Sequence, residues 1–249
     1  MRRKSVVHII GVARLRDRYA RSKLGQTWLV LSQLLNIILF GSVWSVIWQQ
    51  PLDQHLPYIG VGFIIYAFLG TTLNEACNAI IGDSQYYLNS KVPFFLSVFA
   101  HVYRNFLIFL NNLPSIFLLV LWSDSAFMKF DVGWIFGVIL CFIFVSVWTY
   151  IIAATCVRFR DLVQIYGVIF QTAFLVSPVM WKLDFVPSQF HNYFLLNPLA
   201  AGLEILRNPW IGMEVASFAY ISLIVWCIVG LLASNFVYIK LDKKLSLWL

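Results

Sequence analysis

Charged residues are scarce in this chain of 249 residues. They make up 12% of the sequence, whereas an ordinary soluble domain carries roughly 25%. Hydrophobic residues make up 61%, and the mean hydropathy is +0.80. Such a chain is too apolar to be soluble, so its length is better counted in membrane spans than in domains. The composition predicts a single integral membrane domain over residues 1–249.

The sequence also lacks a Gly-x-x-x-x-Gly-Lys-Ser/Thr motif, the loop that cradles nucleotide phosphates. If the protein drives transport, another chain must supply the energy and bind ATP and Mg²⁺, so no cofactor is expected here. The net charge of +7 does not indicate nucleic-acid binding. The basic residues lie at the ends of apolar runs rather than on a solvated face, which membrane topology explains better.

Residues that could form metal or redox sites are few and scattered. Cysteine within an apolar run behaves as a small hydrophobe, and no Cys-x-x-Cys spacing occurs. The histidines form no ligand-spaced pair, so we expect no metal site. The residues concerned are Cys77, Cys141, Cys156 and Cys227, and His8, His55, His101 and His191.

Acidic residues are nearly absent from the apolar runs, where a carboxylate would mark a proton or ion path. Glu75 comes close, but it lies near the end of a run, where a structural salt bridge or exposure explains it better. A proton-coupled carrier is therefore poorly supported.

Six apolar runs predict an all-α membrane protein with six transmembrane helices, since ~20 residues cross a bilayer. Pro178, in the fifth run, must break a backbone hydrogen bond. Residues 94–104 are expected to approach the third span along the interface, and residues 49–57 to form a loop. The predicted spans are residues 28–47, 58–73, 105–122, 132–157, 162–181 and 215–239.

Residues 183–214 contain two short pieces, 187–196 and 199–207, separated by Asn197-Pro198. Each piece is too short to span. We therefore expect half-helices or a re-entrant hairpin, which a membrane tolerates only where it is buried in protein or lines a wet cavity.

Residues 1–27 combine an apolar arc with basic residues, which suits an amphipathic helix lying in the headgroup layer. With the N-terminus inside, fifteen basic residues fall on the inner side and three on the outer side, namely Lys129, Lys182 and Arg207. The positive-inside rule then predicts that both termini are cytoplasmic.

Aromatic residues are abundant, with ten Trp, eleven Tyr and twenty-two Phe. Most are expected in interfacial belts and helix packing. A minority could line a path for sugars, whose C–H faces stack on aromatic rings. The candidates for this path and its gate are Tyr58, Phe63, Tyr66, Pro178, Trp181, Tyr193 and Asn197.

Several strings, in their order along the whole chain, resemble the membrane subunits of ABC-2-type transporters that export polysaccharides. The family pattern Arg-Tyr-x-x-Ser-x-Leu-Gly-x-x-Trp is matched by Arg18, Tyr19, Ser22, Leu24, Gly25 and Trp28. Further matches are Arg160-Asp161-Leu162, Ser177-Pro178-Val179, and Asn197-Pro198-Leu199 with Glu204 and Arg207.

This resemblance implies a homodimer of six-span subunits in the bacterial inner membrane, with a channel at the interface and two cytoplasmic ABC ATPase subunits beneath. The cargo would be a lipid-linked polysaccharide such as O-antigen or capsule. Residues 1–27 would form the interface helix, and residues 183–214 would hold the outer gate helices. The diphosphate of the lipid would enter beside Arg14, Arg18, Arg21 and Lys23, for which plain positive-inside anchoring is the alternative.

Residues 82–93 would contain the coupling helix that docks on the ATPase, through Ser84, Tyr86, Tyr87, Asn89 and Lys91. The family usually places several residues between the coupling-helix lysine and the next proline. Here Lys91 is followed directly by Val92-Pro93, so the end of this helix departs from the pattern.

Two other functions remain open from the sequence. One is an integral membrane transferase acting on lipid-linked sugars, which should carry clustered acidic residues or histidines at one membrane face. The other is an ABC-2 permease for a drug or lipid, which commonly has larger extracytoplasmic insertions. The exporter is favoured because the sequence shows neither feature, and such a subunit is not itself an enzyme.

Overall fold

The computed structural model describes residues 11–12, 27–82, 94–122 and 132–248, with side chains as far as residue 240. Within these residues the chain is helical and contains no strand. The expected contacts of Arg14, Arg18, Arg21 and Lys23 with substrate lie outside the described residues. The same holds for the coupling contacts of Ser84, Tyr86, Tyr87, Asn89 and Lys91.

Five helices are long and apolar enough to cross a membrane, so the protein is a multi-pass membrane protein. They are α2 (Thr27–Ile47), α3 (Leu52–Glu75), α6 (Phe94–Trp122), α7 (Val132–Arg158) and, up to Lys240, α11 (Ser217–Trp248). Five of the six predicted spans are thus confirmed as candidate spans. The remaining predicted span, residues 162–181, corresponds to α8 (Leu162–Val176), an apolar helix of 15 residues that ends before residue 181.

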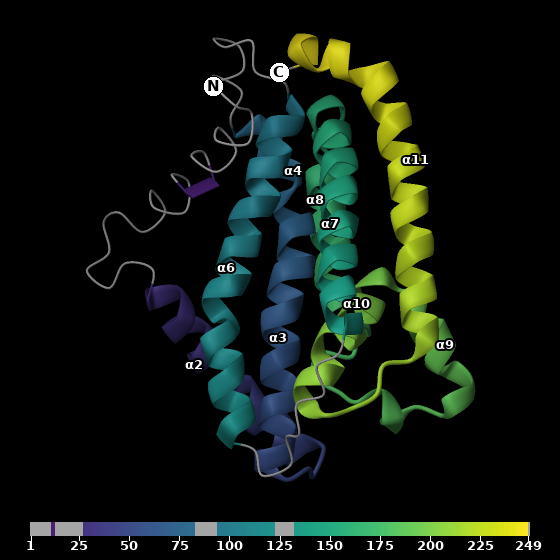
Figure 1. Ribbon diagram of the computed structural model, residues 1–249. Helices are drawn as coiled ribbons and strands as arrows, with labels where there is room; N and C mark the ends of the chain where they lie inside the picture. The colour runs from purple at the N-terminus through teal and green to yellow at the C-terminus, as the bar shows by residue number, and fades with distance from the viewer. Residues whose placement is uncertain (1–10, 13–26, 83–93, 123–131, 249) are drawn as a thin grey trace.

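The shorter elements lie at the two ends of this bundle (Figure 1). α4 (Cys77–Ile81) lies beside the start of α6 at one end, which we call the α4 end. The other, short-helix end carries five short helices. These are η1 (Leu183–Phe185), η2 (Ser188–Phe190), α9 (His191–Leu195), α10 (Pro198–Arg207) and η3 (Asn208–Ile211).

Two sequence predictions about helix ends need correction. Of the predicted loop 49–57, only residues 49–51 are non-helical, because α3 already begins at Leu52 and contains Pro57. Asp53 in its first turn complements the positive end of the helix, and the buried His55 and Leu56 pack inward.

Residues 94–104 are not an interfacial approach either, since they form the first turns of a continuous α6. Polar side chains in these turns, including Ser97 and His101, are buried and bond to α4 and α3. The hydropathy pattern treats such residues as interruptions, whereas helix contacts satisfy them without water.

α3 is the central helix of the bundle. In its most apolar stretch 83% of the residues are buried, compared with 17% for α2, which lies on the outer edge opposite α11 (Figure 1). One close approach depends on Gly60 of α3, where an added Cβ would lie 2.6 Å from Leu119 Cδ1 and 2.9 Å from Ile37 Cγ2. The three helices α2, α3 and α6 therefore meet where α3 has no side chain.

The substitution Gly60→Val should destabilise the fold by about 1–3 kcal/mol, because overpacking forces neighbouring side chains from their preferred rotamers. Unfolding of the purified protein in detergent, followed by circular dichroism, measures this loss. Val46→Leu, on the exposed face of α2, should leave the unfolding midpoint unchanged. A Gly60→Val protein as stable as the wild type would contradict the close packing of these helices.

Candidate functional site

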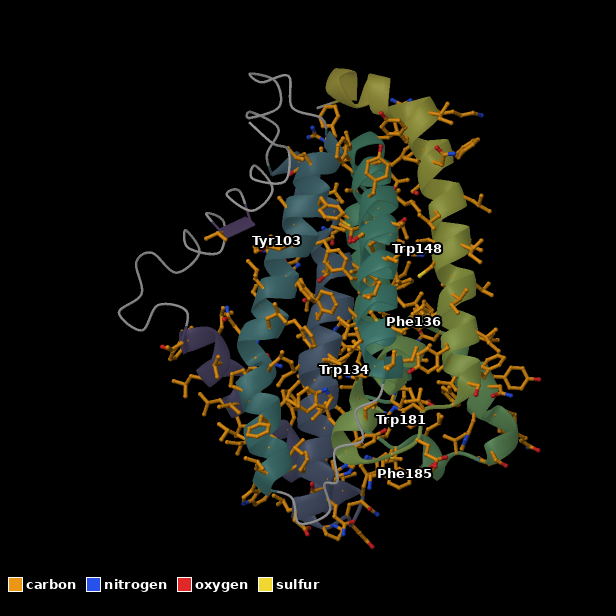
Figure 2. The ribbon with its side chains drawn as sticks, viewed as in Figure 1. Tyr103, Trp134, Phe136, Trp148, Trp181 and Phe185 are labelled. Atoms are coloured by element: carbon orange, nitrogen blue, oxygen red, sulfur yellow. The ribbon has the colours of Figure 1, made fainter. Side chains whose placement is uncertain are left out.

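The candidate site lies at the short-helix end, where residues 177–216 fold back against the first turns of α3. Figure 2 shows Trp181 and Phe185 in this region. Tyr58, in the second turn of α3, is 3% exposed, and its hydroxyl donates to Trp181 O at 3.1 Å and lies 3.5 Å from Pro178 O. The Tyr58 hydroxyl thus ties the chain after α8 to the central helix.

The chain turns after α8 because of Pro178. Ser177 has an extended backbone with ψ of 143°, the conformation that a following proline favours. The helix therefore ends at Val176, and the main-chain carbonyl of Pro178 is left outside any helical hydrogen-bond ladder. This carbonyl becomes an acceptor for side chains from other elements.

Arg207, the last residue of α10, is the principal donor to this carbonyl. Its Nη1 lies 2.5 Å from Pro178 O, and its guanidinium carbon lies 3.8 Å from the centre of the Tyr58 ring. The side chain is 3% exposed. A hydrogen bond and a cation–π contact together compensate for its burial.

Glu204 lies one turn before Arg207 on α10 and is also buried. Its Oε1 accepts from the main-chain N–H of Ala216 at 2.9 Å, which fixes the start of α11 against α10. Burial raises the pKa of Glu204, against the lowering effects of this hydrogen bond and of the Arg207 charge. Burial likewise lowers the pKa of Lys182, which the nearby Asp184 carboxylate opposes.

These residues surround a cavity of about 330 Å³. Side chains of both charges face this cavity, and two of the charged ones, Glu204 and Arg207, are buried. The cavity is therefore suited to a hydrated, hydroxyl-rich or zwitterionic group rather than to an apolar chain. The residues that define it are Tyr58, Lys182, Asp184, His191, Glu204 and Arg207.

Asn197 lies at the start of α10, at the opposite end of this helix from Arg207. Its side chain caps the helix by accepting from Leu199 N at 3.0 Å, and its Nδ2 donates to Ser177 Oγ at 3.0 Å. Asn at the N-cap followed by Pro198 is a strong helix-start signal, so the local sequence accounts for this start of α10.

The remaining predicted path residues lie elsewhere. Phe63 and Tyr66 of α3 both pack edge-to-face on Phe174 of α8, and the Tyr66 hydroxyl donates to Phe170 O at 2.9 Å. Tyr193 on α9 is 70% exposed and lies beside Phe190. The structure therefore brings Tyr58, Pro178, Trp181 and Asn197 together at the short-helix end, places Tyr193 on the exposed surface of the same end, and places Phe63 and Tyr66 apart from it along α3.

Sequence reasoning did not include Glu204, Arg207, Lys182 or Asp184 among the site residues. The signal was present, because Glu204 and Arg207 stand three residues apart on one face of an otherwise apolar ten-residue helix. Two opposite charges on such a face indicate a buried polar contact. Their partners, Pro178 and Ala216, could not be read from the helix itself.

The structure also answers the expectations about cysteines and Glu75. All four cysteines are free and buried, as predicted. Of the two explanations offered for Glu75, a salt bridge or exposure, both apply: it pairs with Arg104 Nη2 at 2.5 Å, and its side chain is 37% exposed. Among the described residues, no three His, Cys, Asp or Glu side chains are grouped to hold a metal ion.

The substitution Glu204→Gln should remove a pH dependence of stability. With a raised pKa in the folded protein, wild-type stability should fall as the pH rises from the ordinary glutamate pKa of 4.5 through the raised value. The variant keeps an acceptor for Ala216 N–H, so its unfolding midpoint should depend less on pH over this window. Unfolding midpoints in detergent from about pH 4 to 8 measure the difference.

The control for this experiment is Glu214→Gln, which alters an exposed carboxylate of the same cavity and should leave the wild-type slope unchanged. A wild-type stability that rises relative to Glu204→Gln across this window would contradict the effect of burial on Glu204.

Comparison with known proteins gives the chain a family. The profile of the ABC-2 type transporter family matches residues 7–209. The O-antigen export system permease protein RfbA of Klebsiella pneumoniae is 22% identical over 229 residues, covering 89% of this chain and 87% of the relative. RfbA of Myxococcus xanthus is 24% identical over 193 residues, or 75% and 73% of the two chains. The polysialic acid transport protein KpsM of Escherichia coli is 20% identical over 217 residues, or 82% and 81%. The chain belongs to the ABC-2 type transporter membrane family.

Proposed function

We propose that the protein is the channel-forming membrane subunit of an ATP-driven exporter that moves a lipid-linked polysaccharide across the bacterial inner membrane. It acts as a homodimer on two cytoplasmic ABC ATPase subunits, which bind ATP and Mg²⁺. The names of relatives that cover most of the chain support a polysaccharide cargo. The missing phosphate-binding loop supports a separate ATPase subunit.

The observation that carries this proposal is the uncovered face of α8. No residue of this helix is buried. Gln164, Gln171 and Thr172 are exposed. Gln171 and Thr172 follow Gln164 by seven and eight residues, so the three side chains lie on the same side of the helix. Lipid offers no hydrogen-bond partner to an amide side chain, so this stripe needs either another protein surface or a water-filled path. A second copy of the chain against this face supplies both.

Aromatic rings continue from this face across α3 to α2. Phe174 of α8 packs on Phe63 of α3, whose ring stacks on Phe40 of α2 with centroids 5.6 Å apart. Phe40 is exposed, whereas Tyr58 and Tyr66 are buried. In this arrangement Phe40 and Phe63 offer ring surface to a passing sugar, and the two tyrosines hold α8 and the following turn in place.

The remaining assignments complete the path. With the α4 end in the cytoplasm, the lipid diphosphate binds Arg14, Arg18, Arg21 and Lys23, and the segment from Ser84 to Lys91 docks on the ATPase. Pro178, Trp181, Tyr193 and Asn197 belong to the gate at the short-helix end. The Arg207 contacts with Pro178 and Tyr58 hold this gate against α3.

One observation favours the transferase alternative. The cavity at the short-helix end gathers Asp184, Glu204 and His191, the kind of cluster that such an enzyme needs. Glu204 Oε1 is occupied by the Ala216 N–H, however, and the charge of Arg207 faces the same cavity. These contacts suit a structural role better than acid–base chemistry.

Reconstitution tests the proposed function. The purified chain alone should hydrolyse no ATP, because it lacks a phosphate-binding loop. In proteoliposomes with its partner ATPase, it should move lipid-linked glycan to the far leaflet in an ATP-dependent manner, measured by protection of the glycan from an added glycosidase. ATP hydrolysis by the chain alone, or a new glycan product without ATPase, would refute the exporter.

Assembly through α8 is tested by Gly167→Leu. No atom lies within 4 Å of a Cβ built on Gly167, so the subunit itself has room for the side chain. If a second copy covers this face, the added bulk should shift the protein from dimer to monomer in multi-angle light scattering and lower export. Val225→Leu, on the exposed face of α11, should leave the dimer intact. An unchanged dimer in Gly167→Leu would place the interface elsewhere.

A further inference from the structure

The central helix is interrupted at the α4 end. α3 ends at Glu75, and α4 begins at Cys77. In a regular helix the N–H of Ala76 would donate to Thr72 O, but here it donates to Leu73 O at 3.2 Å. The tighter turn leaves the Thr72 carbonyl without this N–H partner deep inside the protein, where Thr72 is buried.

A histidine of α6 takes the place of that N–H. His101 Nε2 lies 3.1 Å from Thr72 O, and since a carbonyl only accepts, this nitrogen carries the proton. His101 is 3% exposed. On the α4 side of the break, Ser97 Oγ donates to Ala79 O at 3.0 Å. One stripe of α6 therefore supplies donors to carbonyls on both sides of the interruption.

On the α3 side of the break, an ion pair strengthens the contact between α3 and α6. Arg104 Nη2 lies 2.5 Å from Glu75 Oε2 and donates to Asn105 Oδ1 at 3.2 Å. The Nδ2 of Asn105 lies 3.3 Å from His101 Nε2 but does not donate to it, because that nitrogen carries the proton given to Thr72 O. Glu75 and Thr72 belong to α3, whereas the other three residues belong to α6. We call these five residues the α3–α6 latch.

Apolar packing divides at the same place. Leu73 and Ala76 belong to the main hydrophobic core with the rest of α3. Ala79 and Ile80 of α4 belong to a second cluster, with Val98 of α6 and four residues of α7: Tyr150, Ala153, Ala154 and Val157. Cys77, the first residue of α4, still belongs to the main core, and its thiol is hydrogen-bonded to that of Cys156 on α7. The end of α4 and the end of α3 thus pack in different clusters.

We propose that Ala76 is a hinge between α3 and α4, and that the α3–α6 latch holds α3 in position across it. This inference rests on the proposed function, since α4 leads directly into residues 82–93, which are expected to dock on the ATPase. ATPase closure moves the body that contains α4 and the start of α6, and the latch passes this movement to α3. Thr72, Glu75, His101, Arg104 and Asn105 are positioning residues for export.

Removing the central donor tests the latch. In the complex with its partner ATPase, His101→Leu should lower glycan exported per ATP hydrolysed by about fivefold or more, because a buried carbonyl loses its donor. ATP hydrolysis itself should continue. His101→Gln, whose amide can still donate to Thr72 O, should retain most of the coupling.

Asn112→Leu is the matched control. Asn112 is also a buried polar residue of α6, but its Nδ2 donates to Ile108 O of its own helix, so the change should leave export per ATP unchanged. Equal losses in His101→Leu and Asn112→Leu, or none in His101→Leu, would overturn the latch.

Cross-linking tests the latch from the other direction. In a background without native cysteines, Glu75→Cys and Arg104→Cys should each lower glycan exported per ATP, because each removes the α3–α6 ion pair. Joining the two cysteines of the double variant with a short bismaleimide should restore export, because the covalent link again holds α3 to α6. Oxidation of the native pair Cys77 and Cys156, with Cys141 and Cys227 replaced by serine, should leave export intact, because α4 and α7 move together.

The outcomes separate the two proposals. If the unmodified wild-type complex hydrolyses ATP but exports no glycan, the proposed function is wrong. If the wild type exports and the Glu75→Cys and Arg104→Cys variants, without the cross-linker, export as much glycan per ATP, the latch is wrong while the function stands.

Discussion

A main-chain carbonyl that leaves the helical ladder inside a membrane protein must receive a donor from another element, because lipid offers none. This constraint acts twice on α3 and its neighbours. At the short-helix end Arg207 donates to Pro178 O, and at the α4 end His101 donates to Thr72 O. The helix breaks that shorten α8 and end α3 exist only together with these side chains. At both places a buried polar side chain stands beside an irregular stretch of backbone.

The same constraint explains why a single subunit looks incomplete. α3 is surrounded by protein, but α8 has no buried residue and shows amide and hydroxyl groups on its open face. Scattered exposed leucines and valines need no partner in a bilayer, as on α11. A stripe containing Gln171 and Thr172 does need one. The distribution of polarity, rather than of hydrophobic area, is therefore what leads us to propose the α8 face as the contact with a second copy.

Features encoded in neighbouring residues could be predicted from the sequence. The sequence predicted α2 almost to the residue, a break in the backbone hydrogen bonding at Pro178, and the separate helix after Asn197-Pro198, although it extended the fifth span to residue 181, whereas α8 ends at Val176. The continuous α6 and the site at Arg207 could not be predicted. Both depend on contacts between residues 29 positions apart, Thr72 with His101 and Pro178 with Arg207. A hydropathy profile treats His101 and Arg104 as interruptions of a span. Both residues bond to α3, however, and so attach α6 to it.

The two polar networks share one helix, and this has a mechanical consequence. Tyr58 and Thr72 are both on α3, fourteen residues apart, a distance of about 21 Å along a straight helix. A buried helix transmits tilt over such a length, because its packed side chains resist bending more than they resist rigid movement. A tilt at Ala76 would shift Tyr58, and with it the hydrogen bond to Trp181 O and the cation–π contact with Arg207. The segment after α8 is fastened to α3 by these contacts, so displacement of α3 would carry this segment with it.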